Sequence, residues 1–440
     1  MLIDKFHNME MDYRLFELDP HIPYWDILRY SVYLKYYYTE NSQSNLKTYK
    51  NKHLFKDYLI LFIYFLKQLF YILTKNYDNL ILTVSRYYNK ETKRYYDMSA
   101  HPFIKLANKN IIAVEMVMNK KVDYPFLCDF SNVFARLNKK VRLPYSVYTK
   151  IEAAVVSVMG ENRLSYDELN YVYKIYDAEI KYYTLLLKKL HVKNVIICKG
   201  NPKAIIKVCR NMNITTTLVQ HASIERDEVD YSYPDSISCE NQMILFSDSV
   251  ATFGSYWCTN VNVPVRNIIT IGNDEMYNVP NLKCDNSFVV ISSIIHGTEL
   301  KYSAREIALS YPDRKVIYKL HPNEYHLKSE YIEFFRDVQN VRVIDIEDST
   351  KNLVAKSSVV IAIVSAVVYD ALHQGKIVAI LQRINYRRQQ CIMRNSNVFM
   401  YNTTQEFVSK FNTMIPKKNS LSYYECLKPD KVKKLLSGNF

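Results

Sequence analysis

The chain has 440 residues, of which 48% are hydrophobic and 23% charged, a globular composition that excludes a largely disordered protein and a length that fits two domains. Lysine and arginine (58) outnumber aspartate and glutamate (44), giving a formal net charge of +14. This surplus favours anionic partners such as nucleic acid, an acidic membrane surface or phosphorylated substrates, with a well-solvated basic surface as the alternative.

The first quarter of the chain contains one strongly apolar segment. Residues 1–5 lack a basic stretch followed by an apolar run, so no secretion signal is expected. Segment 54–73 is very apolar, but charged residues interrupt it and leave an uncharged run of only 58–66, which is too short to span a bilayer. It is expected to be either a buried core helix or an aromatic-rich helix in a membrane interface. The eight cysteines include no CxxC pair, which argues against a zinc ribbon or redox motif and fits a reducing cytosol.

The first half then alternates between short apolar runs and helical segments. This rhythm predicts βαβ units and a mainly parallel sheet. Strands are expected at 79–85, 111–115, 194–200 and 215–221, and helices at 165–190 and 202–212.

A second cycle follows the Asn-rich stretch 273–286, which predicts an interdomain linker. Strands are expected at 287–292, 315–320, 341–345, 359–363 and 376–381, and helices at 304–310 and 365–374. The chain is therefore predicted to be an α/β protein of two facing Rossmann-like domains with a cleft between them. Residues 1–272 would form the first domain and residues 287–440 the second.

Two strand ends in the second half carry candidate phosphate ligands. His321 and Pro322 follow a buried strand, where the imidazole can donate to a phosphate oxygen and the proline fixes the turn. Ser365 lies between another apolar strand and a helix, so its hydroxyl and the adjacent backbone N–H groups form an anion site. A simple strand-ending turn and an ordinary N-cap serine are the structural alternatives. Because ligands bind beyond the carboxyl ends of strands in open α/β sheets, both loops are expected to share one pocket.

Three further residues are candidates for the same pocket. Asp370, in the helix after Ser365, could accept hydrogen bonds from ribose hydroxyls. Ser293 and Gly297 follow the first strand of this half, where a glycine would let the backbone approach a ligand closely. An ordinary loop is the alternative for these two residues.

Together these residues resemble a known family. The pattern Tyr-Lys-Leu-His-Pro-x-Glu at 318–324, then Ser-x-x-x-x-Asp-Ala-Leu at 365–372 and Gly-Lys at 375–376, resembles the C-terminal domain of bacterial capsule and lipopolysaccharide glycosyltransferases with the GT-B fold. This group includes sialyl-, polysialyl- and Kdo-transferases and, more distantly, CDP-glycerol polymer transferases. The resemblance implies that His321, Pro322 and Ser365 hold the donor phosphate and that Asp370 contacts the ribose. The family often has a second hydroxyl where this chain has Ala366.

In the first half, Leu-Val-Gln-His-Ala-Ser at 218–223 resembles the Gln-His-Gly/Ala segment of capsule-type transferases. His221 could be the general base for the acceptor hydroxyl or an electrostatic partner of the donor, with a buried structural histidine as the alternative. Glu161, in Gly-Glu-Asn at 160–162, is the reserve base. Arg86, at an early strand end, could meet an anionic acceptor or lie on the surface. The acids after His221 are expected to be mostly solvated loop charges: Glu225, Asp227, Glu228 and Asp230.

The resemblance implies a metal-independent transferase with no cofactor beyond its nucleotide-sugar donor, in which residues 1–272 form the acceptor-side domain and residues 287–440 the donor-binding domain. The acidic stretch 345–348 is expected to follow a strand rather than bind a hard cation. There is no GxGxxG, Walker A, HExxH or GxSxG motif, and no recognised nucleic-acid motif. By resemblance, CMP-sialic acid or CMP-Kdo is favoured as donor, with a UDP- or GDP-sugar, or a non-catalytic nucleotide-sugar-binding protein, as alternatives. The partners expected are this donor and a glycan or glycolipid acceptor, at the inner face of the cell membrane.

Overall fold

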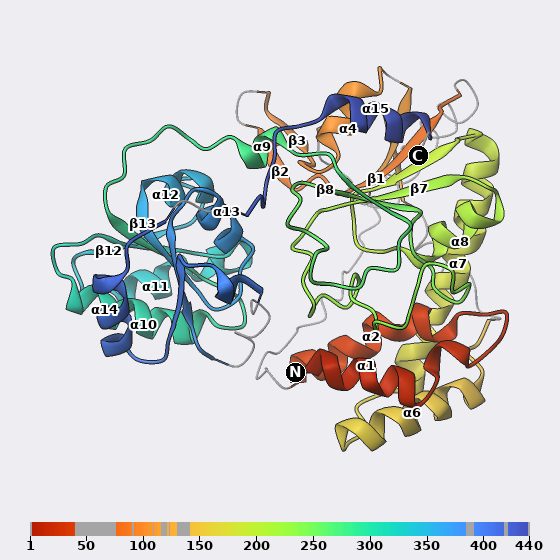
Figure 1. The fold of residues 1–440 in the computed structure, drawn as a ribbon, viewed down its shortest axis with the longest axis horizontal. Helices are drawn as coiled ribbons and strands as arrows, with labels where there is room; N and C mark the ends of the chain where they lie inside the picture. Colours follow the sequence, from red (N-terminus) through yellow and green to blue (C-terminus); the bar gives the residue numbers. More distant parts are fainter. Residues whose placement is uncertain are drawn as a thin grey trace, which may run out of the picture.

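Two parallel β-sheets organise the molecule (Figure 1). The computed structural model describes residues 2–39, 76–89, 92–108, 110–115, 121–122, 124–129, 141–383, 391–417 and 421–438. A seven-stranded sheet lies in the first half of the chain and a six-stranded sheet in the second, and the strand pairings in both are parallel. The predicted α/β class with two Rossmann-like units is confirmed.

The first sheet has the strand order β5-β4-β1-β6-β7-β8-β9. Its strands are β1 (Asn79–Thr83), β4 (Ile111–Glu115), β5 (Phe126–Cys128), β6 (Asn194–Ile197), β7 (Thr215–Val219), β8 (Ser249–Thr252) and β9 (Asn267–Thr270). Strands β1, β4 and β6 are buried along their whole length, as expected for parallel strands covered on both faces. The strand order reverses between β1 and β6, which makes their carboxyl ends the expected ligand position in this sheet.

The second sheet has the order β12-β11-β10-β13-β14-β15. Its strands are β10 (Ser287–Ile291), β11 (Val316–Lys319), β12 (Val341–Ile344), β13 (Ser357–Ala362), β14 (Ile377–Leu381) and β15 (Val398–Tyr401). The order reverses between β10 and β13, so the expected ligand position lies beyond the carboxyl ends of these two strands.

Helices surround both sheets (Figure 1). They are α1 (Leu2–Asp12), α2 (Tyr24–Thr39), α4 (His101–Leu106), α6 (Tyr145–Met159), α7 (Tyr166–Leu190), α8 (Lys203–Asn211), α9 (Asp274–Tyr277), α10 (Gly297–Ser310), α11 (Lys328–Phe334), α12 (Thr350–Lys356), α13 (Val367–His373), α14 (Thr404–Thr413) and α15 (Pro429–Ser437). Short elements complete the described chain: the hairpin of β2 (Tyr87–Asn89) and β3 (Arg94–Tyr96), and the 3-10 turns η1 (Leu15–Glu17) and η2 (Pro322–Leu327). Among the helices in the described ranges, none has both the length and the apolar character needed to cross a bilayer. Segment 54–73 lies outside those ranges.

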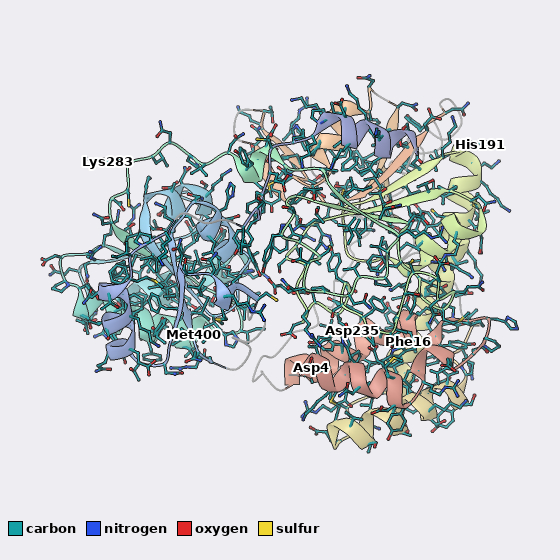
Figure 2. All side chains as sticks on the ribbon, viewed as in Figure 1. Asp4, Phe16, His191, Asp235, Lys283 and Met400 are labelled. Atoms are coloured by element: carbon teal, nitrogen blue, oxygen red, sulfur yellow. The ribbon has the colours of Figure 1, made fainter. Side chains whose placement is uncertain are left out.

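A buried ion pair fixes the N-terminal helices to the first half. Nη2 of Arg29 on α2 donates to the carboxylate of Glu10 on α1 at 3.1 Å, and the two side chains are 2% and 0% exposed. The guanidinium also donates to the carbonyl oxygens of Val229 and Ser232. The network therefore connects α1, α2 and the segment that follows β7. Phe16, labelled in Figure 2, adds a ring contact to Tyr233 with 6.2 Å between centroids.

His7 on α1 should make stability depend on pH. Its side chain is buried, and burial lowers its pKa from 6.5 to about 3, with the positive charge of Arg29 acting in the same direction. The unfolded chain therefore takes up a proton near pH 6.5 that the native state takes up only near pH 3, so stability falls as the pH falls through this window. Between pH 8 and pH 5, His7 should therefore lower the free energy of unfolding by about 2 kcal/mol.

Urea unfolding of wild type and His7→Gln at both pH values measures this cost. The difference in unfolding free energy should shift by about 2 kcal/mol in favour of the variant at pH 5. A difference that is equal at pH 8 and pH 5 would contradict the buried neutral state of His7.

The last described helix returns to the first half. Helix α15 packs against α4, as Figure 1 shows. Near the start of the linker, Gly272 has φ +72°, and an added Cβ would lie 2.0 Å from the backbone oxygen of Cys426. This close approach brings the start of the linker to the C-terminal segment, where the backbone N–H of Asn273 donates to the carbonyl oxygen of Glu425 at 2.9 Å. The boundaries 1–272, 273–286 and 287–440 remain a proposal. Figure 2 labels Lys283 on the outer part of the linker and Met400 in the second half.

Candidate functional site

Three predicted donor residues come from loops at one edge of the second sheet. Strand β10 lies between β11 and β13, and all three run parallel. Ser293 follows β10, His321 follows β11 and Ser365 follows β13. Parallel strands place their carboxyl ends on the same edge, so the three loops are neighbours there. Two of them, those with Ser293 and Ser365, flank the point where the strand order reverses.

The ring of His321 presents one nitrogen as a hydrogen-bond donor. Its Nδ1 accepts from the backbone N–H of Asn323 at 3.2 Å, so in the neutral ring the proton is on Nε2. None of the residues that the structure describes accepts a hydrogen bond from Nε2. Burial lowers the pKa of His321, while Glu324 opposes this shift. A neutral Nε2–H donor suits a phosphate oxygen.

Glu324 fixes the backbone of His321, and the sequence interpretation did not include it among the site residues. Its buried carboxylate accepts from the His321 backbone N–H at 3.1 Å and from the Tyr331 hydroxyl at 2.8 Å. With the His321 ring this forms a capping box for η2. The spacing of a cap residue and a glutamate three positions later is the sequence signal for it.

Gly297 packs closely against side chains of the loop and helix that follow β11. An added Cβ would lie 2.5 Å from Oε1 of Glu324 and 2.6 Å from the Tyr331 hydroxyl. The space that a Cβ at Gly297 would occupy is therefore filled by Glu324 and Tyr331, while the close approach of a ligand to this glycine stays a prediction. Gly297 also begins α10 rather than lying in an ordinary loop. The negative carboxylate of Glu324 is favourable beside this helix N-terminus.

The Gly297→Ala variant should displace Glu324. We expect a loss of about 1–3 kcal/mol of unfolding free energy, because the added methyl group overpacks a buried hydrogen-bonded carboxylate. Nucleotide affinity should fall as well, since His321 loses its backbone support. Urea unfolding and calorimetric titration with CMP measure the two effects. Gly375→Ala is the control, because Gly375 has φ +68° and no atom near an added Cβ. It should lower stability without changing affinity; an equal change of affinity in both variants would contradict the role of Glu324.

Ser293, Ser365 and Asp370 each have a hydrogen-bond partner within the protein. The hydroxyl of Ser365 accepts from the backbone N–H of Val367 at 3.2 Å, and that of Ser293 accepts from the backbone N–H of His296 at 3.3 Å. Asp370 lies one turn into α13 and hydrogen-bonds Tyr424 of the C-terminal segment. Burial raises its pKa to about 6, although Tyr424 and the charge of Lys351 act in the opposite direction.

His221 lies at the carboxyl end of β7 in the first sheet. Its Nε2 accepts from the backbone N–H of Gly200 at 3.1 Å, so the neutral ring carries its proton on Nδ1, 3.1 Å from the Tyr231 hydroxyl. Burial lowers the pKa of His221, and the positive charge of the exposed Arg86 acts in the same direction. In this state Nε2, the basic nitrogen of the ring, accepts a hydrogen bond from Gly200 in the loop after β6.

The other predicted acids lie apart from the second sheet's edge. Glu161 follows α6 and pairs with Arg163, while its backbone oxygen accepts from the Tyr36 hydroxyl at 3.1 Å. The expectation of solvated charges is wrong for Glu225 and Asp227, which are buried. Burial also raises the pKa of Asp230 to about 6. In the stretch 345–348 the acids pair with lysines: Lys328 with Asp345 and Glu347, and Lys356 with Asp348.

A cavity of about 590 Å³ lies between the two halves of the chain. The first half contributes the hairpin β2–β3 and α4, the linker contributes α9, and the second half contributes Lys351 at the start of α12. Its aromatic and aliphatic wall is formed by Tyr95, Tyr96, Ile104 and Tyr124, and its charged wall includes Arg94, Asp97, Lys105, Asp274 and Glu275. None of the predicted site residues lines it. Lys351 connects the two regions, because its charge acts on Asp370.

Comparison with known proteins gives no family assignment. No family model and no curated protein matches the chain. Solved structures similar to it include UDP-GlcNAc 2-epimerase from Methanocaldococcus jannaschii, with 11% identity over 82% of this chain and 99% of that chain and a TM-score of 0.48. UDP-GlcNAc 2-epimerase from Neisseria meningitidis bound to UDP-GlcNAc has 14% identity over 81% and 93%, with a TM-score of 0.44. MurG from Acinetobacter baumannii has 9% identity over 82% and 95%, with a TM-score of 0.43.

Proposed function

We propose that this chain is a glycosyltransferase that moves a sugar from a nucleotide-activated donor to a hydroxyl of a surface-polysaccharide or lipopolysaccharide acceptor, without a metal. The observation that carries the proposal is that the Ser293, His321 and Ser365 loops follow neighbouring parallel strands and so lie at the same carboxyl edge of the second sheet. Two of these loops flank the reversal of strand order, where α/β sheets bind their ligands. The motif pattern at 318–324 and 365–372 supports the same site.

The proposed chemistry is electrostatic stabilisation of the leaving nucleotide. As the glycosidic bond breaks, negative charge grows on the phosphate oxygens. His321 would donate from Nε2–H to one of these oxygens, and the hydroxyl of Ser365 to another. Donors that are already oriented need no rearrangement during the reaction, which is why such groups lower the barrier. Glu324 would act through His321 as a positioning residue.

The acceptor hydroxyl must lose a proton as it attacks, and His221 is the first candidate for the base. It lies at the carboxyl edge of the first sheet, whereas Glu161 lies beside Tyr36 and Arg163. To accept the proton on Nε2, His221 would release the Gly200 N–H. We therefore expect His221→Gln to lower turnover strongly and Glu161→Gln to leave it near the wild-type rate. The reverse order, measured as nucleotide release with acceptor present, would move the role to Glu161.

The donor and location follow from the resemblance and the charge. A CMP-activated sugar, CMP-sialic acid or CMP-Kdo, is favoured, and a UDP- or GDP-sugar is the alternative. The surplus of positive charge supports an anionic acceptor and a peripheral position at the inner face of the cell membrane. A second candidate function is non-catalytic binding of a nucleotide sugar. Two observations favour it: Ala366 stands in place of a second hydroxyl, and Nε2 of His221 already accepts a hydrogen bond from Gly200.

The test is a panel of CMP-, UDP- and GDP-sugars incubated with the full chain, with released nucleotide as the readout. We expect release from a CMP-sugar, and less release with Ser365→Ala. Nucleotide binding without release from any donor would favour the non-catalytic function. Neither binding nor release would contradict the proposal.

A further inference from the structure

The carboxylates in the cavity wall already accept hydrogen bonds from the protein. Asp97 accepts from the Thr83 hydroxyl at 2.7 Å and from the backbone N–H of Ser99 at 2.8 Å. Asp274 accepts from the backbone N–H of Leu427 at 2.8 Å. Glu275 accepts from the Tyr96 hydroxyl at 3.0 Å. These acids therefore have less capacity left for a ligand's donor groups than their number suggests.

Two cations of the wall, Lys105 and Lys351, are less well neutralised. Lys105 makes no ion pair or hydrogen bond with any residue in the described ranges. Lys351 donates to the backbone oxygen of Glu275, which has no formal charge. Burial lowers the pKa of Lys351 even though Asp370 and Glu275 act to raise it. An anionic group in the cavity would stabilise both ammonium groups.

The rest of the wall suits a ring-shaped ligand. Tyr95, Tyr96 and Tyr124 contribute aromatic rings, and Ile104 adds an aliphatic side chain. The volume, about 590 Å³, is within the range of small-molecule sites, where mostly apolar walls carry a few oriented polar groups. A sugar ring can bury its apolar C–H face on such a wall while its hydroxyls meet the polar groups. A flat nucleobase would not use the cations.

We propose that this cavity binds the acceptor sugar and that this sugar carries an anionic substituent, a carboxylate or a phosphate. The inference rests on the proposed transferase function and extends it to the class of acceptor. Lys351 lies in the cavity wall, and its charge acts on Asp370 of α13, the helix that begins after Ser365. Through these two residues the cavity is linked to the proposed donor site.

Saturation-transfer NMR on the full chain without nucleotide tests this directly. The probes are glucose, glucuronic acid and glucose 6-phosphate, which share a ring and differ in charge. At least one of the two anionic sugars should bind, and at least about 10-fold more tightly than glucose, because glucose lacks the charge-assisted contact to the lysines. The better of the two identifies the substituent. Failure of both to bind, or equal binding of glucose, would overturn the proposal.

Two cavity variants and one control locate the binding. Lys105→Gln and Tyr95→Leu should each weaken the anionic sugar by about 10-fold and leave CMP affinity unchanged. Lys150→Gln, at an exposed lysine of α6, should change neither. An equal effect of the control, or loss of CMP binding in both cavity variants, would overturn the assignment. Because the sugar titrations contain no donor, they are independent of whether the chain turns one over.

Discussion

The Arg29→Met variant is expected to lose about 3–5 kcal/mol of unfolding free energy, because it leaves the Glu10 carboxylate buried without its counter-charge. The side chains of Arg29 and Glu10 are 2% and 0% exposed. Burial raises the pKa of Glu10 even with Arg29 and Trp25 in place, so the carboxylate depends on these donors to stay ionised. The variant also removes the donors to the carbonyl oxygens of Val229 and Ser232. Urea unfolding at pH 7 measures the loss.

Two further variants separate charge burial from packing. Adding Glu10→Leu to Arg29→Met should recover part of the loss, since it removes the unpaired charge while keeping the site apolar. Arg305→Met is the surface control, because Arg305 pairs with Asp337, whose side chain is 64% exposed, and exposed pairs contribute at most about 1 kcal/mol. A loss in Arg29→Met as small as in this control would contradict the buried network.

Substitutions at His321 should separate its two functions. Asparagine can place Oδ1 where Nδ1 now accepts the Asn323 N–H, so His321→Asn keeps the cap of η2 but removes the outward donor. Affinity for CMP should fall by about 10- to 100-fold, the effect of one hydrogen bond to a charged group. Glutamine can place its amide N–H near the Nε2 position, so His321→Gln should keep most of the affinity and lose some stability through the cap.

The matched control for this pair is His326→Asn, at an exposed histidine of the same turn. It should change neither CMP affinity nor stability. Calorimetric titration and urea unfolding of the three variants give the comparison. If His321→Asn binds CMP as the wild type does while His321→Gln binds poorly, His321 acts only through the cap, and its role as a phosphate donor is contradicted.

The sequence predicted the central strands because their residues are apolar and continuous. Strands β1, β6, β10 and β14 are buried throughout. A short continuous apolar run between turns is typical of such a buried parallel strand. Strands nearer the sheet edges gave weaker signals. β9 (Asn267–Thr270) has two exposed residues, and β8 (Ser249–Thr252) is buried but made of small and polar residues. Both lay outside the predicted elements.

The sequence predicts which loops carry the candidate site, but it does not predict the hydrogen bonds of their side chains. The turn at His321 and Pro322 follows from a strand that ends in a proline turn, yet the pattern does not say which ring nitrogen remains available. Asn323 and Glu324 decide that through the capping box. The cavity was missed because its wall comes from the hairpin, α4, α9 and α12, which no local pattern connects. The contact between Gly297 and Glu324 could not be predicted either, because Glu324 comes from another strand's loop.

Histidine-ring NMR spectra of the full chain, recorded as CMP is added, test whether His321 donates a hydrogen bond to the donor phosphate. With the His321 signals assigned from His321→Gln, nitrogen-15 spectra report the protonation of each ring nitrogen. We expect a neutral His321 with its proton on Nε2 in the free protein, and a large shift of that N–H signal when the phosphate binds. Binding of CMP with no change at His321, or with changes confined to His221, would contradict a donor-phosphate site at the edge of the second sheet.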